Sequence, residues 1–281
     1  TKKKNIIKIF KKYNPNYIFV SKSNFSFMKR FCNKQYSFCE YILLKNKFSK
    51  KIVLNKDLSI LLSTSGSMGS SKFVKLSKIN IKFNADSIIK YLKIIKNDAA
   101  ITNLPISYSY MLSIINTHLE VGGRIVVTDR SIIEKEFWKI FNNNRITSFN
   151  GVPYTFEILK KIGMNKVNSG SLRYITQAGG KLDDDIMKKL SFFCRINKIS
   201  FFSMYGQTEA SPRISYLDPK FLENKIGSIG KEIPGTKIYL VDDNNVKISK
   251  PFTKGEIVAK GKNIFMGYSN NYKDLKKPNS E

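Results

Sequence analysis

Short apolar runs alternate with segments of helical periodicity through the middle of the chain. Each run has the length of a strand, and the segments between the runs carry apolar residues at the spacing of an amphipathic helix. The runs occupy 99–104, 123–127, 148–152, 174–178 and 201–204. This alternation predicts an α/β fold, with layered parallel sheets and flanking helices.

The first hundred residues contain elements of the same kinds. Residues 2–12 have apolar positions at helical spacing between lysines, which predicts a surface helix. Residues 17–21 and 57–63 have the apolar character of strands. The second of these runs leads into a Ser/Gly-rich segment at 64–72, and 79–96 again shows helical spacing. We therefore expect a unit of strand, loop and helix here.

The pattern changes after Pro212, where glycines become frequent. The apolar run 237–241 is followed by the polar turn 242–245, an arrangement typical of strands joined by tight connections. We therefore expect two parts. The first is an α/β core over 1–212, incomplete at its N-terminal side, and the second is a smaller β-rich subdomain over 213–281.

Composition narrows the function classes only slightly. The 281 residues are 42% hydrophobic, which is enough for a core, but no apolar stretch reaches the roughly 18 to 20 residues of a membrane span. The net charge is +28, yet lysine is spread along the chain together with Asn and Ile. We interpret the charge as a compositional bias and expect no specific nucleic-acid partner. If the protein retained DNA or RNA in a salt-sensitive way, the charge would instead serve nucleic-acid binding.

The cysteines and the histidine do not suggest a metal site. The three cysteines are an odd number without metal-ligand spacing, and the chain has one histidine, His118. A reducing cytoplasm suits free thiols of this kind. The cysteines are Cys32, Cys39 and Cys194.

Three segments at the ends of expected strands carry candidate chemistry. The segment 64–72 combines glycines, hydroxyls and a terminal lysine, which are groups that can surround phosphate, although a plain connector can have the same composition. The segments 177–180 and 205–209 add glycines, an aromatic ring and a carboxylate. Loops at strand ends are the usual ligand sites of α/β sheets. Together, these segments favour a nucleotide.

In their order along the chain, these motifs resemble the AMP-forming adenylate synthetase superfamily, which includes acyl-CoA synthetases, nonribosomal peptide adenylation domains and luciferases. The family's phosphate loop reads Thr-Ser-Gly-Ser/Thr-Thr-Gly-x-Pro-Lys-Gly, and this chain has TSGSMGSSKF from Thr64, with Ser71 and Phe73 in place of Pro and Gly. The family's Tyr-Gly-x-Thr-Glu motif stands intact at 205–209, and glycine blocks follow as far as 268. The resemblance covers about residues 60–268.

The resemblance implies a role for each matched position. Glu209 would hold Mg²⁺, and Thr208 would contact the α-phosphate. Thr208, Glu209 and Lys72 would be the catalytic residues. The phosphate-binding residues would be Thr64, Ser65, Gly66, Ser67, Gly69 and Lys72, and the adenine would lie against Gly179, Gly180, Tyr205 and Gly206.

The implied reaction joins a carboxylic acid to AMP, releases pyrophosphate and passes the acyl group to a thiol. ATP and Mg²⁺ are the implied cofactors, with CoA or the phosphopantetheine of an acyl carrier protein as acceptor. The acyl pocket would include Tyr108, Gly151 and Val152. Tyr110 and Tyr154, with Tyr108, would favour a small acid, although core packing explains such aromatics equally well. The segments 104–119, 150–157 and 204–213 are most similar to synthetases of bacterial surface-polysaccharide biosynthesis.

The matched segments cover only part of the family's pattern. The family continues after its Gly-Tyr block with a Thr-Gly-Asp segment and a small domain carrying a catalytic lysine, which do not appear before Glu281. The start has no initiator Met and no signal-peptide pattern. We therefore expect a fragment with weak or no adenylation by itself. A non-catalytic nucleotide-binding or scaffold protein of the same fold is the alternative.

Three other features favour structural interpretations, and a fourth, Arg213, stays open. His118 lies in an apolar helical segment and is expected in the core. The aspartates 183–185 precede a helical segment and are expected to cap it. Arg213 would contact a ligand or form an ion pair, and the sequence leaves both open. Cys194 has only Arg195 as a basic neighbour and is expected to be inert.

Overall fold

A computed structural model describes residues 2–64, 73–167 and 170–277. The chain forms two compact units, which are described separately. Unit 1 joins the first 75 residues to the segment from Met266 onwards, and unit 2 comprises Leu76–Phe265.

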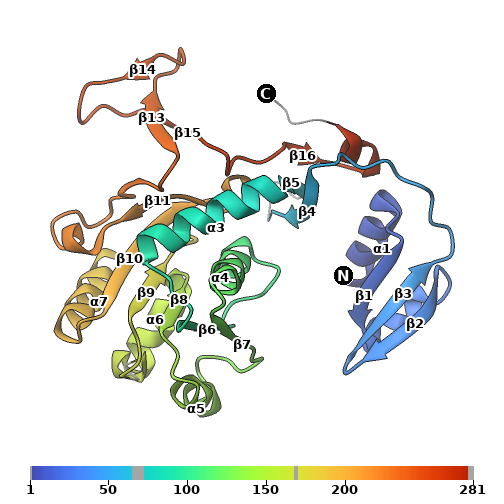
Figure 1. Ribbon diagram of the computed structural model, residues 1–281, viewed down its shortest axis with the longest axis horizontal. Helices are drawn as coiled ribbons and strands as arrows, with labels where there is room; N and C mark the ends of the chain where they lie inside the picture. Colours follow the sequence, from blue (N-terminus) through green and yellow to red (C-terminus); the bar gives the residue numbers. More distant parts are fainter. Residues whose placement is uncertain (1, 65–72, 168–169, 278–281) are drawn as a thin grey trace. The chain divides into compact units, whose positions relative to one another are not determined.

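The framework of unit 2 is a seven-stranded sheet with the order β12-β11-β10-β9-β8-β6-β7 (Figure 1). The five strands from β10 to β7 are parallel, and β11 and β12 are added antiparallel at one edge. This confirms the α/β fold with a parallel-rich sheet. The strands are β6 (Ala99–Ile101), β7 (Arg124–Val126), β8 (Ser148–Gly151), β9 (Tyr174–Gln177), β10 (Ser200–Gly206), β11 (Arg213–Leu217) and β12 (Lys231–Glu232).

Helices cover both faces of this sheet, because neighbouring residues of a strand point to opposite sides. Phe201 packs with α5, α6 and α7, whereas Phe202 packs with α3 and α4 on the other face. The helices are α3 (Lys78–Leu92), α4 (Ser109–Glu120), α5 (Lys135–Asn143), α6 (Pro153–Ile162) and α7 (Asp184–Ile196). Short 3₁₀ turns occur at Met164–Val167, Thr208–Ala210 and Pro219–Phe221.

Local sequence explains where α3 begins and ends. The Ser77 hydroxyl accepts from the Asn80 N–H at 3.0 Å, and the Asn80 side chain accepts from the Ser77 N–H at 2.8 Å. This reciprocal cap satisfies two backbone donors at the start of the helix. The helix ends at Leu92, before the limit of 96 expected from periodicity, because Lys93 adopts a left-handed conformation.

The expected boundary after residue 212 does not coincide with these units. The difference arises because β11 follows residue 212 in sequence but pairs with β10, so that it belongs to the main sheet. The β-rich texture of the later residues corresponds to a small antiparallel sheet with the order β14-β13-β15. Its strands are β13 (Lys237–Val241), β14 (Lys247–Ile248) and β15 (Glu256–Lys260).

Unit 1 contains two three-stranded sheets, β1-β3-β2 and β16-β5-β4. The first sheet buries one face against Phe10 of α1 and Met28 of α2. Its elements are α1 (Lys2–Tyr13), β1 (Tyr17–Ser21), a 3₁₀ turn (Lys22–Asn24), α2 (Phe25–Met28), β2 (Cys32–Phe38) and β3 (Tyr41–Asn46). The second sheet comprises β4 (Leu58–Ser63), β5 (Phe73–Ser77) and β16 (Tyr268–Ser269), followed by a 3₁₀ turn at Tyr272–Lys276.

The expected unit of strand, loop and helix needs one correction. β5 lies between the segment 64–72 and α3, so a second strand, and not the helix, follows that segment. Phe73 begins this strand, and its ring centroid lies 5.0 Å from that of Tyr13. The apolar stretch of β5 is too short to be recognised as a strand from periodicity. Its last residue, Ser77, is already the cap of α3.

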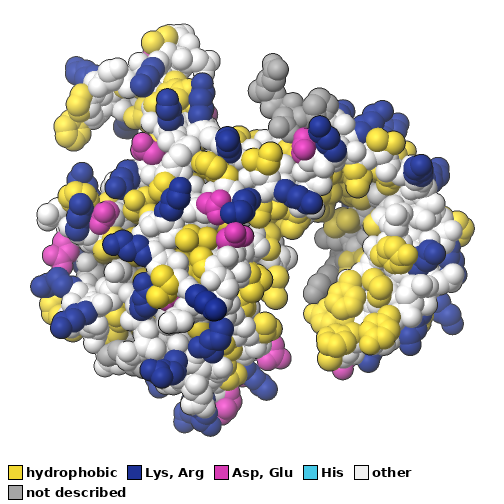
Figure 2. Space-filling view, in the orientation of Figure 1, with side chains coloured by type: hydrophobic (Ala, Val, Ile, Leu, Met, Phe, Trp, Pro, Cys, Tyr) yellow, Lys and Arg dark blue, Asp and Glu magenta, His cyan; other side chains and the backbone are white. Residues whose placement is uncertain are grey.

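The distribution of charge agrees with a compositional bias. Figure 2 shows Lys and Arg side chains dispersed over the visible face of unit 2, with apolar and acidic side chains between them. None of the helices in the described part of the chain combines the length and the apolar character that a membrane crossing requires.

Candidate functional site

A cavity of about 490 Å³ opens at the carboxyl ends of β9 and β10. These neighbouring parallel strands bring their following loops to the same edge of the sheet, as expected for a ligand site in an α/β fold. The lining residues are Gln177, Gly179, Gly180, Lys181, Leu182, Met187, Ser203, Met204, Tyr205, Gly206, Gly227, Ser228 and Ile229. The four residues expected at the adenine are therefore brought together around one cavity.

The loop after β9 is held in place by the buried side chain of Gln177. Its Nε2 atom donates to the Gly180 carbonyl at 2.7 Å, and its Oε1 atom accepts from the Ser203 hydroxyl at 3.3 Å. Gly179 has φ +85°, a conformation that favours glycine. The loop therefore presents a fixed stretch of bare backbone to the cavity, against which a flat ring could lie.

The end of β10 also depends on a close backbone approach. The pairing of β10 with β11 shifts register between Tyr205 and Gly206. A Cβ atom on Gly206 would overlap the Pro212 carbonyl oxygen and would lie 3.1 Å from the Arg213 Cα. Only glycine fits at this position, and the resulting bulge places the half-buried Tyr205 on the cavity wall.

Thr208 and Glu209 follow directly in a 3₁₀ turn, and both are half-buried. The hydroxyls of Thr208 and Ser109 are 3.2 Å apart and share a hydrogen bond, which connects this turn to the first residue of α4. The Glu209 carbonyl accepts from the Phe265 N–H at 2.9 Å. These contacts hold both residues beside the cavity-lining Tyr205 and Gly206.

The expected acyl-pocket residues converge on the same loop from another side. A Cβ atom on Gly179 would collide with the Tyr108 hydroxyl and would lie 3.1 Å from a Val152 methyl. Gly151 ends β8, and its carbonyl accepts from the Ala178 N–H at 3.2 Å. Tyr110 is buried, whereas Tyr154 is 67% exposed. Of the three tyrosines that were considered, Tyr108 is therefore the one in contact with Gly179.

Most of the expected phosphate-binding residues lie outside the described part of the chain. These are Ser65, Gly66, Ser67, Gly69 and Lys72. Thr64 is described and follows β4 in unit 1. The roles of all six remain predictions.

The features interpreted as structural lie in the interior or at a helix end. His118 is 1% exposed, and its Nδ1 lies 2.8 Å from the Ile114 carbonyl. Asp183 caps α7 by accepting from the Asp185 and Ile186 N–H groups, both at 3.1 Å. Burial raises the pKa of the Cys194 thiol to about 12, which disfavours the nucleophilic thiolate. In the described ranges, no cluster of three or more His, Cys, Asp or Glu side chains could hold a metal ion.

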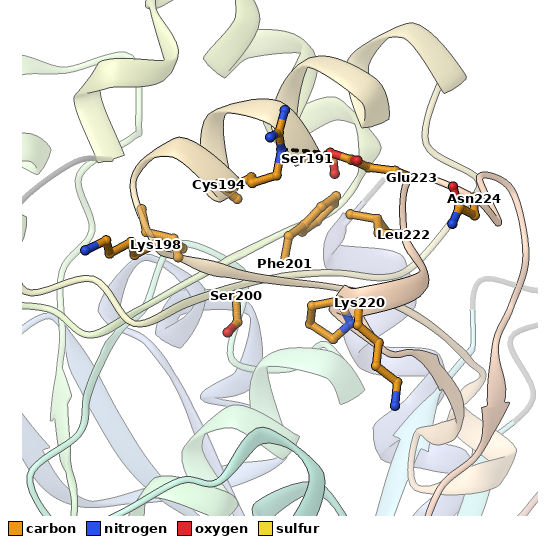
Figure 3. A pocket seen from close by; sticks show the side chains of 12 residues that line it. Ser191, Cys194, Lys198, Ser200, Phe201, Lys220, Leu222, Glu223 and Asn224 are labelled. Atoms are coloured by element: carbon orange, nitrogen blue, oxygen red, sulfur yellow. Dashed lines mark ion pairs between the residues drawn. The ribbon is translucent and has the colours of Figure 1, made fainter.

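A second hollow lies at the amino end of β10 and has a different character. It has a volume of about 360 Å³, and Arg195 of α7 forms an exposed 3.0 Å ion pair with Glu223 beside it. Figure 3 shows the Lys198 and Lys220 side chains extending away from the apolar floor formed by Phe201 and Leu222. Among the residues that the structure describes, none of the expected site residues lines this hollow.

Sequence reasoning missed part of the cavity wall. Ser203 and the segment 227–229 line it although they were not among the expected site residues. The Ser215 hydroxyl donates to the Ile229 carbonyl at 2.7 Å and anchors this segment to β11. The glycines at 227 and 230 were a usable signal, but only the fold shows that the segment from Gly227 to Ile229 lines this cavity.

The sequence and fold match known proteins. The family described as AMP-binding enzyme matches residues 15–269. A 2-succinylbenzoate–CoA ligase from Bacillus subtilis (strain 168) is 28% identical over 212 residues, which are 75% of this chain and 41% of that protein. A long-chain-fatty-acid–CoA ligase from the same organism is 25% identical over 224 residues, which are 78% of this chain and 39% of that protein.

The fold of this chain is also similar to that of a solved structure. The O-succinylbenzoate coenzyme A synthetase from Bacillus subtilis in complex with ATP and magnesium ion aligns with a TM-score of 0.68 and 25% identity. The alignment covers 82% of this chain and 47% of that one. The chain thus spans less than half the length of these relatives.

Proposed function

The chain belongs to the AMP-binding enzyme family, and we propose that it forms the nucleotide- and acid-binding part of an enzyme that activates a carboxylic acid with ATP. One observation carries the proposal. Gly179 and Gly180 of the loop after β9, together with Tyr205 and Gly206 at the end of β10, line one cavity at the carboxyl edge of the sheet. Bare glycine backbone with an aromatic side chain is suited to a planar base.

The proposed reaction needs positioning more than covalent participation by the protein. A carboxylate oxygen of the acid attacks the α-phosphorus of ATP, the new acyl–phosphate bond forms, and pyrophosphate leaves with the electrons of the broken bond. Tyr205 and the glycine loop would orient the base, and the Thr208 hydroxyl would donate to the α-phosphate. Bound Mg²⁺ would neutralise phosphate charge, and the Glu209 carboxylate supplies the hard oxygen ligand that Mg²⁺ prefers.

The acid is proposed to be small. The Tyr108 hydroxyl and the Val152 side chain both lie against Gly179, where the acyl group would approach the nucleotide. Because these two side chains lie so close to Gly179, they would leave little space there for a large acyl group. CoA is the proposed acceptor because the matched relatives are CoA ligases, and the phosphopantetheine of a carrier protein is the other thiol to test. The three free cysteines suit a reducing, cytoplasmic setting.

The first experiment tests the base site in the 281-residue chain. AMP binding is measured by calorimetry for the unaltered chain and for Tyr205→Ala. The loss of base stacking should weaken binding by about 1–3 kcal/mol, or roughly five- to 150-fold. Tyr154→Ala is the matched control, because Tyr154 is 67% exposed and does not line the cavity. Equal affinities in all three proteins would contradict the assignment of this cavity to adenine.

Turnover separates an adenylating enzyme from a non-catalytic relative. ATP–pyrophosphate exchange is measured on the full-length protein with short, aromatic and long-chain carboxylic acids. Exchange that depends on a short acid is the expected result. AMP binding without exchange for any acid would favour the non-catalytic alternative.

A further inference from the structure

The guanidinium of Arg213 is buried without a carboxylate. Arg213 begins β11, and 2% of it is exposed. Arg130, Arg173 and Arg195 form ion pairs, whereas none joins Arg213 to an acidic side chain in the described part of the chain. A buried charge is ordinarily paired, because its transfer out of water is costly. The sequence left a ligand contact and an ion pair open, and an ion pair is not present among these residues.

The contacts of Arg213 satisfy only part of its hydrogen-bonding capacity. Its Nη2 atom donates to the Ser113 hydroxyl at 3.3 Å, its side chain also hydrogen-bonds with Tyr91, and its guanidinium carbon lies 4.6 Å from the centroid of the Tyr110 ring. The Nε atom has no partner in the described residues. A guanidinium has five N–H donors, has no acceptor and stays charged. The aromatic face stabilises the cation without supplying a negative charge.

A small cavity of about 10 Å³ adjoins this group. Asn150 also lines it, and the Asn150 Nδ2 atom is a second buried donor without a partner among the described residues. Two acceptors that line this cavity beside Asn150 are already used. The Thr176 hydroxyl donates to Asn150 Oδ1 at 2.6 Å, and Thr176 Oγ1 lies 2.6 Å from the Tyr110 hydroxyl. Two buried donors without partners therefore belong to residues that line the same cavity, where an acceptor would satisfy them.

The titratable groups around the cavity do not supply that acceptor as an anion. Burial lowers the pKa of His118, so that its imidazole stays neutral at neutral pH. Its Nδ1 atom donates to the Ile114 carbonyl at 2.8 Å, which leaves Nε2 to accept from the Tyr174 hydroxyl at 3.3 Å. Burial raises the pKa values of Tyr110 and Tyr174, so both keep their protons. The other lining side chains are apolar or carry hydroxyls.

We propose that Arg213 and Asn150 form a buried binding site for one small anionic acceptor. The volume suits a monatomic anion or a single oxygen atom better than phosphate or sulfate. A halide from solution or a single anionic oxygen has the required size and charge. The oxygen would come from a second acidic group on the acid substrate, because Asn150 immediately precedes Gly151 of the proposed acyl pocket. This second source rests on the proposed function, whereas the halide source does not.

Bromide is the probe for the site. Crystals of the unaltered chain are soaked in sodium bromide, and the melting temperature is followed in sodium bromide against sodium gluconate at equal ionic strength. We expect an anomalous peak in contact with Arg213 and Asn150, and a saturable rise in melting temperature with bromide. A fully folded protein with neither a peak nor a bromide-specific rise would overturn the proposal.

Three variants make the test specific. Arg213→Met should lose the peak and the rise. Ser113→Asp places a carboxylate on the hydroxyl position that Arg213 already contacts, and should lose the bromide response while keeping a folded protein. Arg195→Met removes an exposed, ion-paired arginine and should keep the full response. An unchanged response in both Arg213→Met and Ser113→Asp would also overturn the proposal.

A competition experiment identifies the source of the anion. Succinate is added to the bromide-soaked protein, with acetate as the control that lacks a second carboxylate. Loss of the bromide peak with succinate alone would assign the site to an acidic group of the substrate. Retention of the peak with both acids would assign it to a free halide. The bromide measurements stand even if the protein fails to adenylate any acid.

Discussion

Two cavities of similar size lie at opposite ends of the parallel strands, one at the carboxyl ends of β9 and β10 and one at the amino end of β10. Their walls are built in different ways. At the carboxyl ends of β9 and β10, a cavity of about 490 Å³ is bounded by glycine backbone at 179, 180 and 206. At the amino end of β10, a hollow of about 360 Å³ is bordered by the long side chains of Arg195, Lys198 and Lys220. Volume alone does not distinguish a site from a surface hollow.

The difference lies in what holds the walls. At the carboxyl edge, a buried Gln177 fixes the glycine loop, so that this wall is preorganised and a ligand need not order it. At the amino edge, the border consists of solvated lysines and an exposed ion pair, and these must lose rotamer freedom before they can bind anything. Preorganised backbone is therefore the better indicator of a binding site here.

The largest difference is expected in thiol chemistry. Cys194 lines the amino-end hollow but is 2% exposed, and with its pKa raised to about 12 only about one thiol in ten thousand is ionised at pH 8. Ellman's reagent should therefore modify it by orders of magnitude more slowly than Cys39, because Cys194 is buried and Cys39 is exposed. Raising the pH towards 12 should reduce this difference, because the thiolate forms only as the pH approaches the raised pKa. Equal rates at pH 8 in the folded protein would show that the hollow holds a reactive thiol.

The next largest effect is expected from Gly206→Ala at the carboxyl edge. A Cβ atom there collides with the Pro212 backbone, and relief requires a break in the β10–β11 pairing. We expect the free energy of unfolding to fall by more than ~3 kcal/mol in urea denaturation. Gly227→Ala is the control, because its Cβ meets open space and only its φ of +81° is unfavourable. That variant should lose about 1–2 kcal/mol. Similar losses in the two variants would contradict the close approach.

Gly180→Val should separate binding from stability. The added side chain would replace the bare backbone of a cavity-lining residue, and its Cβ would lie 3.2 Å from the Pro153 ring. AMP affinity should fall at least tenfold, or about 1.4 kcal/mol. Ser200→Val makes the comparable change at the amino end of β10, where the side chain is exposed, and should leave affinity unchanged. If Ser200→Val weakened AMP binding more than Gly180→Val, the nucleotide would bind at the amino end of β10, and the proposed site would be wrong.

The smallest effect is expected from the Arg195–Glu223 pair. Its side chains are 63% and 57% exposed, so solvent screens the attraction. A double-mutant cycle with Arg195→Ala and Glu223→Ala should give a coupling energy below ~1 kcal/mol that declines with added salt. AMP affinity should not change in either variant. A coupling of several kcal/mol would mean that the amino edge is more rigid than its exposure indicates.

Local pattern was sufficient for most of the parallel strands. The strand-like runs at 148–152 and 174–178 correspond to β8 and β9 within a residue, although polar residues such as Asn150 and Gln177 occur in both strands. The hairpin of β2 and β3 was not predicted. β2 exposes most of its residues and contains the polar stretch Asn33–Gln35, so it shows no apolar alternation. Its pairing with β3 holds it in the sheet.

By itself, the sequence determined the α/β alternation, the glycines at strand ends and the family motifs, because each of these depends on residues close together in the chain. Only the tertiary structure decided which loops share a cavity. Gly179 lines the same cavity as Tyr205 because β9 and β10 are parallel neighbours. Gly227 lines it too, because Ser215 of β11 anchors the nearby Ile229. The same long-range packing buries Arg213 among tyrosines and away from acidic side chains in the described residues. The surroundings of a side chain depend on strand order and helix placement, and neither can be read from its neighbours in sequence.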